Sequence, residues 1–312
     1  MGTDSMLVSL SPRELLPYKD DFYLWKFVPS MPVAIIFLII FLALSILHTW
    51  RMYRERMWFC LPFVIGGYLE VTGYGGRAAA NKATDQLGPY VIQSVFLLIP
   101  PSLFAASIYM TLGRVIRNLG LKAESCLFIK VRWLTTIFVV GDIFAFLVQS
   151  GGAGFMAAGT DPKMGEIIVV SGLAIQILFF GVFVAAAVSF QMKYCHHSPK
   201  QQTASTWKSL FCRRQEESNG EVSWRSMMNM LYAVSVLILA RSIFRIIEYV
   251  MGADAYLLSN EWPLYVFDGV LMAGAMAIFY VYYPSSIRSA QSLSQADTLE
   301  IGEMGNSGSS KP

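Results

Sequence analysis

Six ionisable residues lie within long apolar stretches of this 312-residue chain, namely Glu70, Asp142, Arg241, Arg245, Glu248 and Asp268. A charge at the centre of a membrane-spanning helix costs about 2.5–3.5 kcal/mol when it faces lipid. Because folded proteins are only marginally stable, six such charges cannot all face lipid. We expect them to face one another or a water-filled cavity, where they could hold a polar substrate group or carry protons.

Helical spacing places several of these charges on shared faces. Glu70 and Arg77 are seven residues apart and would lie on one face of a helix. Arg241, Arg245 and Glu248 follow one another at spacings of four and three, which predicts a charged stripe along one helix. The residues that we expect to bind substrate or couple protons are Glu70, Arg77, Gln93, Asp142, Gln149, Gln176, Arg241, Arg245, Glu248 and Asp268.

The elements that carry these residues are predicted to be membrane-spanning helices. The chain is 55% hydrophobic and 14% charged, and a bilayer core about 30 Å thick takes about 20 mostly apolar residues to cross. Seven stretches meet this requirement, at about residues 28–48, 57–79, 90–112, 128–150, 166–192, 227–250 and 262–283. Uninterrupted apolar runs such as 33–47 do not alternate as barrel strands do. We therefore expect an all-α integral membrane protein built as a seven-helix bundle.

The distribution of lysine and arginine predicts the orientation of this bundle. The first, third and fifth loops and the helix ends beside them hold Arg51, Arg54, Arg56, Arg114, Arg117, Lys122, Lys130, Arg132, Lys193, Lys200, Lys208, Arg213, Arg214 and Arg225. The other three loops and their flanks hold Arg77, Lys82 and Lys163. Since cytoplasmic loops carry the excess of positive charge, the N-terminus is expected outside and the C-terminus in the cytoplasm. Residues 1–27 would form an extracellular segment, 28–284 the transmembrane domain, and 285–312 a disordered cytoplasmic tail.

With this orientation, the candidate polar residues fall in the outer half of the membrane, and the inner half is nearly all apolar. Pro100 and Pro101 lie in the middle of the third stretch. Each proline removes a backbone donor and clashes with the preceding helical turn. We therefore expect this pair to bend the helix and to act in gating.

Several short motifs occur one after another along the chain. Glu70-Val-Thr-Gly73-Tyr74-Gly-Gly-Arg77 has the form E-x-x-G-Y-x-x-R. It is followed by Gln93, Pro100, Ala105, Ala106, Tyr109, Asp142, Gln149, Gly151, Gly152, Gly154, Gly172, Leu173, Gln176, Arg241, Phe244, Arg245, Glu248, Gly252, Glu261, Tyr265 and Asp268. Over about residues 20–285, these positions resemble the fungal RTA-type family of lipid-translocating exporters. The chain differs at Tyr282-Tyr283-Pro284, where a histidine before the proline is common in the family.

The resemblance implies a seven-span protein that moves amphiphiles such as sphingoid bases, sterol-like drugs or porphyrins and contributes to toxin resistance. It adds Tyr74 and Tyr265 to the expected site. The expected partners are membrane lipids and amphiphilic small molecules, with no cofactor and no enzymatic activity. The plasma membrane is the expected location, with the vacuolar or endosomal membrane as the alternative. The resemblance leaves the substrate and the oligomeric state open.

Other functions fit the sequence less well. A seven-span receptor or membrane-stress regulator that binds an amphiphile in its outer half is the main alternative, although the third stretch ends Leu112-Gly113-Arg114 without an acidic-Arg-aromatic triplet. ATP hydrolysis is not supported, because the chain has no G-x-x-x-x-G-K-[ST] motif. A metal-dependent hydrolase is disfavoured because the three histidines, His48, His196 and His197, lie at the inner side, far from the carboxylates. The net charge of +3 gives no reason to expect nucleic acid.

Overall fold

The computed structural model describes residues 25, 27–81, 84–119, 131–157, 162–197, 221–251 and 261–283, and the regular structure within these ranges is entirely helical. Its elements are α1 (Met31–Glu55), η1 (Trp58–Cys60), α2 (Leu61–Ala80), α3 (Leu87–Leu98), α4 (Pro100–Asn118), α6 (Val131–Ala157), α7 (Pro162–His197), α8 (Glu221–Val250), α10 (Trp262–Leu264), the π-helical turn η4 (Tyr265–Val270) and α11 (Leu271–Val281). The segment expected at 285–312 lies outside the described residues, as does almost all of 1–27.

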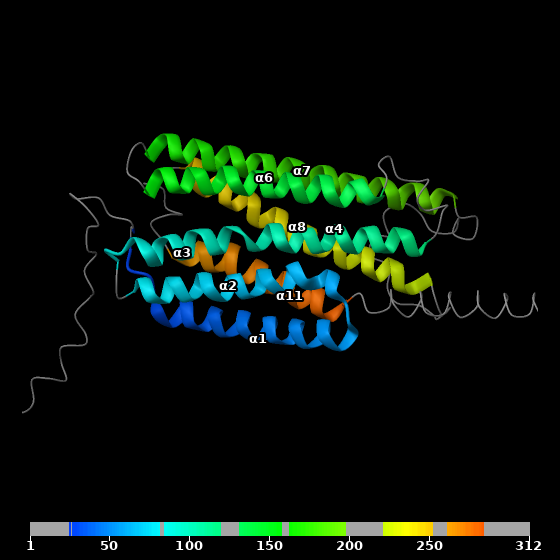
Figure 1. Cartoon of the computed structure of the whole chain (residues 1–312), viewed down its shortest axis with the longest axis horizontal. Coiled ribbons are helices and arrows are strands. Elements are labelled where there is room, and N and C mark those ends of the chain that lie inside the picture. The colour runs from blue at the N-terminus through cyan, green and yellow to red at the C-terminus, as the bar shows by residue number, and fades with distance from the viewer. Residues whose placement is uncertain are drawn as a thin grey trace, which may run out of the picture.

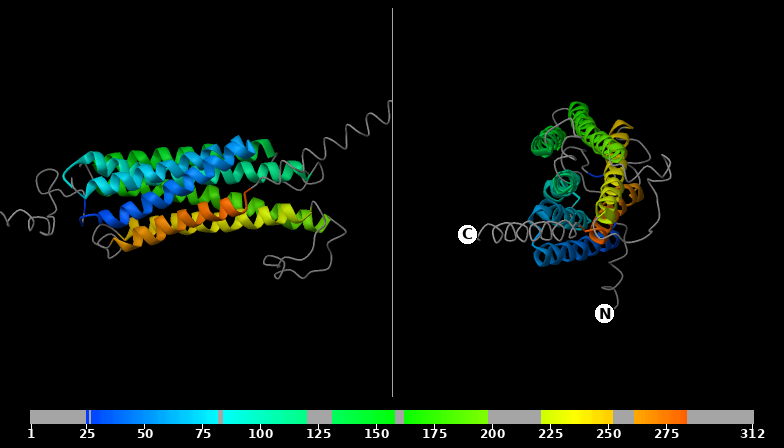
Figure 2. Two further views of the ribbon diagram at one scale, coloured as in Figure 1. Left: turned by 90° about the horizontal axis from the view of Figure 1, so that it is seen from below. Right: turned by 90° about the vertical axis from the view of Figure 1, so that its right-hand side faces the viewer.

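The long helices run along one axis and form a bundle (Figure 1). Helices α6 and α7 lie side by side along one edge, and α1 lies along the other. Between these edges, α2 packs against α1, and the line formed by α3 and α4 packs against both α2 and α6. Helix α8 crosses the bundle at an angle and packs against α4, α7 and α11, and the turned views in Figure 2 show α11 beside it.

Within the described part of the chain, six helical segments are long and apolar enough to cross a membrane. They are Met31–Glu55, Leu87–Asn118, Thr135–Met156, Lys163–Tyr194, Arg225–Val250 and Trp262–Val281. Helix α2 is not among them, because glycines, tyrosines, Glu70 and Arg77 replace much of its apolar surface. Several helices also extend past the predicted apolar stretches, since a helix satisfies its own backbone hydrogen bonds and can continue beyond the hydrocarbon core.

In the third predicted span, the series of backbone hydrogen bonds is interrupted at the proline pair, although the backbone at Ile99 keeps right-handed helical angles (φ −72°, ψ −42°). Helix α3 ends at Leu98 and α4 begins at Pro100, so Ile99 forms the junction. The backbone N–H groups of Ser102 and Leu103 both donate to the carbonyl of Ile99, at 3.1 and 3.3 Å. Prolines are tolerated in the first turn of a helix because those N–H groups have no intrahelical partner. Pro100 and Pro101 therefore begin a new helix in line with the old one.

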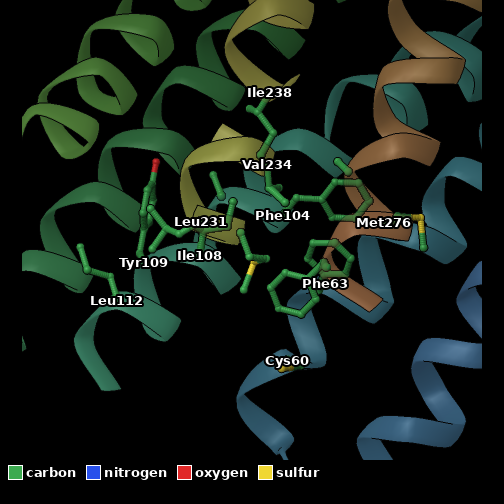
Figure 3. Packing of buried hydrophobic residues seen from close by; sticks show 14 of the residues in the cluster. Cys60, Phe63, Phe104, Ile108, Tyr109, Leu112, Leu231, Val234, Ile238 and Met276 are labelled. Atoms are coloured by element: carbon green, nitrogen blue, oxygen red, sulfur yellow. The ribbon is translucent and has the colours of Figure 1, made fainter. Parts of the chain in front are cut away.

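Aromatic and aliphatic side chains fill the half of the bundle around η1 and the beginning of α2. Phe63 on α2 stacks between Phe104 on α4 and Phe279 on α11, with ring centroids 4.3 and 4.2 Å away. Leu231 and Val234 extend this packing to α8 (Figure 3). Four helices thus share one apolar core, which fixes the positions of the polar groups nearer the other end.

Candidate functional site

The predicted site residues gather toward the end of the bundle where α2, α6 and α8 finish and α3, α7 and α10 start. All twelve are buried: Glu70, Tyr74, Arg77, Gln93, Asp142, Gln149, Gln176, Arg241, Arg245, Glu248, Tyr265 and Asp268. The side-chain hydrogen bonds divide most of these residues into separate groups on different helices.

Four charged side chains form the arginine cluster, made of Arg241, Arg245 and Glu248 on α8 and Asp268 on η4. One carboxylate oxygen of Asp268 accepts from Arg241 Nε, and the other accepts from an Arg245 nitrogen at 2.6 Å. Arg245 also donates to Glu248 at 3.0 Å. The helical spacing of the α8 residues accounts for the Arg245–Glu248 pair. Two positive and two negative charges therefore balance within the cluster.

The arginine cluster also reaches the junction between α3 and α4. In a regular helix the carbonyl of residue i accepts from the N–H of residue i+4, so the partner of Leu97 would be residue 101. That residue is proline, which has no N–H. The freed Leu97 carbonyl instead accepts a hydrogen bond from the Arg241 guanidinium. An unsatisfied buried carbonyl is costly, so Arg241 stabilises the helix interruption.

A second group, the Arg77 latch, joins α2, α3, η4 and the segment before α1. Arg77 donates to Tyr265 Oη at 2.9 Å, to Gln93 Oε1 at 3.3 Å and to Glu261 Oε1 at 2.8 Å. The same oxygen of Glu261 accepts from Tyr265 Oη and from the Ser30 backbone N–H, each at 2.8 Å. Burial acts to raise the pKa of Glu261, but the Ser30 hydrogen bond and the Arg77 charge outweigh it and lower that pKa. The carboxylate is therefore held ionised.

Polar side chains on α4, α6 and α7 form two smaller groups. Tyr109 donates to Asp142 at 2.9 Å. Further along the same helices, Gln149 donates to Gln176 at 2.9 Å, and Gln176 donates to Ser102 at 3.2 Å. Ser102 lies in the first turn of α4, directly after the junction. The hydrogen bonds from Gln149 through Gln176 to Ser102 thus reach the beginning of α4 from the side opposite to α2.

Two predicted residues make no side-chain hydrogen bond within the described part of the chain. Both carboxylate oxygens of Glu70 and the hydroxyl of Tyr74 are buried and lack a partner there. The Tyr74 ring stacks against both Phe37 and Phe41 of α1, with its centroid 5.4 Å from each of theirs. Both residues lie on α2.

Five contributors to the site were not among the predicted residues. They are the Ser30 N–H, the Leu97 carbonyl, Ser102, Tyr109 and Glu261. Leu97 could have been found, because a proline four residues later always frees a helical carbonyl. Glu261 and Tyr109 belong to the positions that resemble the RTA-type family, but their spacing alone gave them no partner.

The described residues contain no group of three or more His, Cys, Asp or Glu side chains placed to hold a metal ion. The side chains of His196 and His197 lie outside the described set. Within the described ranges, His48 is buried and its Nε2 lies 3.0 Å from the Met276 carbonyl.

Apolar spanning helices around buried ion pairs define a multi-pass α-helical membrane protein. This chain belongs to the RTA1-like family, because the family model described as "RTA1 like protein" matches residues 63–291. Protein RTA1 of Saccharomyces cerevisiae is 33% identical over 291 residues, which cover 85% of this chain and 86% of that protein.

Two further relatives from the same yeast carry more informative names. Protoporphyrin uptake protein 1 is 30% identical, over 84% of this chain and 92% of its own length. Sphingoid long-chain base transporter RSB1, from the Lalvin EC1118 strain, is 24% identical, over 91% of this chain and 79% of its own length. No solved structure matches the chain.

Proposed function

We propose that this protein moves amphiphilic, lipid-like molecules across its membrane and thereby contributes to lipid export or toxin resistance. The observation that carries the proposal is the arginine cluster, a buried set of charges that is bound directly to an interrupted helix. Buried ion pairs are a poor way to gain stability, whereas charges and broken helices at mid-membrane depth are typical of transport pathways. The names of two relatives point to amphiphilic cargo.

The proposed topology has seven spans, with α2 as the additional one. Helix α2 has 20 residues and packs against α1, α3 and α4. A helix enclosed by neighbours needs little apolar surface of its own, so its glycines and charges are compatible with a span. The lysine and arginine distribution supports an orientation with the N-terminus outside and the C-terminus in the cytoplasm. Residues 28–284 then form the transmembrane domain, and the plasma membrane is the proposed location.

In this topology, the polar groups occupy the outer half of the bundle. The arginine cluster and the Arg77 latch would receive the headgroup, while the apolar tail lies against the aromatic core. Sphingoid bases, sterol-like molecules and porphyrins are the proposed substrate classes. The junction at Ile99 is the proposed gate, because it has polar contacts on two sides, from Arg241 to Leu97 and from Gln176 to Ser102.

Substitution of the site residues tests this proposal in cells. Asp142→Asn, Arg241→Ala and Glu248→Gln are each expected to abolish resistance or transport while the protein still reaches its membrane. Tyr53→Phe is a suitable control, because Tyr53 is an exposed residue at the far end of α1. Surface fluorescence of a tagged protein reports membrane arrival separately from activity.

Two outcomes would contradict the proposal. Wild-type activity in all three variants at normal expression would exclude the polar groups as the transport site. Retention of all three inside the cell would mean that these charges only hold the bundle together. A ligand-binding receptor is the alternative if all three variants lose ligand binding and the wild type moves no substrate.

A further inference from the structure

Glu70 occupies an unusual position in the bundle. Its side chain is fully buried, and neither carboxylate oxygen has a hydrogen-bond partner among the described residues. The charged groups near it are Asp268 on η4 and Arg241 and Arg245 on α8. An ionised carboxylate without donors is strongly disfavoured in such a place, and such a group normally becomes neutral instead.

The charges of the surrounding residues also favour a neutral Glu70. Arg241 and Arg245 are already balanced by Asp268 and Glu248 within the arginine cluster. An ionised Glu70 would add one uncompensated negative charge beside Asp268, and two adjacent carboxylates seldom both ionise. Glu70 must therefore hold a proton or another cation in this arrangement.

Arg241 and Arg245 are the positive charges that act on Glu70 within the described part of the chain. Helix α1 presents Ser45, and His48 lies one turn further along with its Nε2 at the Met276 carbonyl. Gln93 of α3 and Tyr265 of η4 are both engaged by Arg77. The titratable and charged groups that interact with Glu70 are thus Asp268, Arg241, Arg245 and Tyr74.

We propose that Glu70 holds a proton in this conformation and is the proton-coupling residue of the protein. This inference rests on the proposed transport function for its coupling role but not for the protonation itself. The other three buried carboxyl groups each accept a hydrogen bond from a side chain. Asp268 accepts from two arginines, Glu248 accepts from Arg245, and Asp142 accepts from Tyr109. Glu70 alone among these four lacks a donor within the described residues.

Loss of this proton would act on the gate through Arg241. The O–H bond of the Glu70 carboxyl breaks, the proton passes to water that enters the polar end, and one negative charge remains on the carboxylate. That charge attracts the Arg241 guanidinium, which in the observed conformation binds Asp268 and the Leu97 carbonyl. Movement of Arg241 toward Glu70 releases the carbonyl at the junction, and reprotonation reverses the step. Proton exchange and helix movement are thereby coupled.

Infrared spectroscopy of the full-length protein in lipid vesicles tests the protonation directly. A neutral carboxylic acid has a C=O stretching band that a carboxylate lacks. We expect a component of this band at neutral pH that is lost completely in Glu70→Gln and is restored, at a shifted frequency, in Glu70→Asp. Glu248→Gln is the matched control, because it removes a carboxylate paired with arginine and should leave the band intact.

Several results would overturn the inference. A band unchanged in Glu70→Gln would show that Glu70 is ionised. A Glu70 component that appears only after Na⁺ is removed would identify a metal cation, rather than a proton, as its occupant. A component that is lost in Asp142→Asn but not in Glu70→Gln would assign the buried proton to Asp142.

Flux measurements on the same vesicles separate the coupling role from the protonation. If the wild type responds to a pH gradient, Glu70→Gln is expected to abolish that response while substrate binding remains. A gradient response that survives in Glu70→Gln would overturn the coupling role. If the wild type moves no substrate at all, the proposed transport function fails, yet the infrared result still decides whether Glu70 is protonated.

Discussion

Arg241 donates a hydrogen bond to the backbone carbonyl of Leu97, an acceptor that is free because Pro101 has no N–H. This contact joins two features that the sequence shows separately, the charged stripe of α8 and the proline pair of the third span. Since the same guanidinium binds Asp268, we expect a change of charge in the arginine cluster to affect the helix junction. We therefore infer that the ion pairs and the interruption act together.

Replacing Pro101 with alanine should separate the arginine cluster from the helix junction. An alanine at this position would supply the missing N–H, and the regular helix would compete with Arg241 for the Leu97 carbonyl. A hydrogen bond to a charged group contributes about 1.5–3 kcal/mol, so we expect substrate turnover to fall about tenfold or more. Equilibrium binding of a fluorescent amphiphile should change much less than turnover.

Pro100→Ala is the matched control for this experiment. Its restored N–H faces the carbonyl of residue 96 rather than that of Leu97. Turnover in Pro100→Ala should therefore stay close to that of the wild type. Equal effects of the two substitutions, or equal losses of affinity and turnover, would indicate that the proline pair is only a static packing feature.

Asp268 should be the most important residue of the arginine cluster for stability. Asp268→Asn leaves two buried guanidinium groups without full compensation, and breaking a buried ion pair typically costs about 3–5 kcal/mol. In Glu248→Gln, Arg245 keeps its contact with Asp268, so the loss should be smaller. Thermal unfolding in detergent measures both variants. Similar unfolding temperatures for the two would contradict the geometry described here.

The Arg77 latch should weaken in acid. The pKa of Glu261 is lowered in the folded protein, so its contribution is fully present above the ordinary glutamate range and is lost as the pH falls through the lowered value. Glu261→Gln should therefore destabilise the protein at neutral pH, and its difference from the wild type should shrink as the pH falls. A difference that is constant across this range would show that the charge of Glu261 contributes nothing.

Two buried tyrosines provide a matched pair. Tyr109 donates to Asp142, whereas the Tyr74 hydroxyl has no partner in the described part of the chain. Tyr109→Phe should cost about 1–3 kcal/mol because it deprives Asp142 of its donor. Tyr74→Phe removes an unsatisfied hydroxyl and should be close to neutral in the free energy of unfolding. The reverse order would show that the functional hydrogen bond lies at Tyr74.

Much of this architecture is predictable from the sequence, for physical reasons. Apolar runs of membrane-spanning length predict helices, and six such helices are found in the described residues. The spacing of Arg241, Arg245 and Glu248 correctly predicts that they share one face, because helical geometry alone decides it. Their burial also follows from the cost of exposing charge to lipid.

Partner choice is less predictable, because it depends on how helices distant in the sequence pack together. The sequence places Arg77 on the same helix face as Glu70 but does not identify its partner Glu261, which is 184 residues away. Asp142 was expected to face another charge or a water-filled cavity, and it accepts a hydrogen bond from an uncharged tyrosine. The interruption at Ile99 shows a third case, in which a local rule for proline predicts a free carbonyl but not the arginine that binds it.

The most direct measurement of the central claim is flux through the purified protein in liposomes. Leaflet accessibility of a fluorescent sphingoid base would be followed without ATP, with and without a pH gradient, in wild-type protein and in Arg241→Ala. We expect protein-dependent movement without ATP and its loss in Arg241→Ala. Tight binding of the amphiphile with no movement under any condition would contradict the transport function and would identify the protein as a receptor.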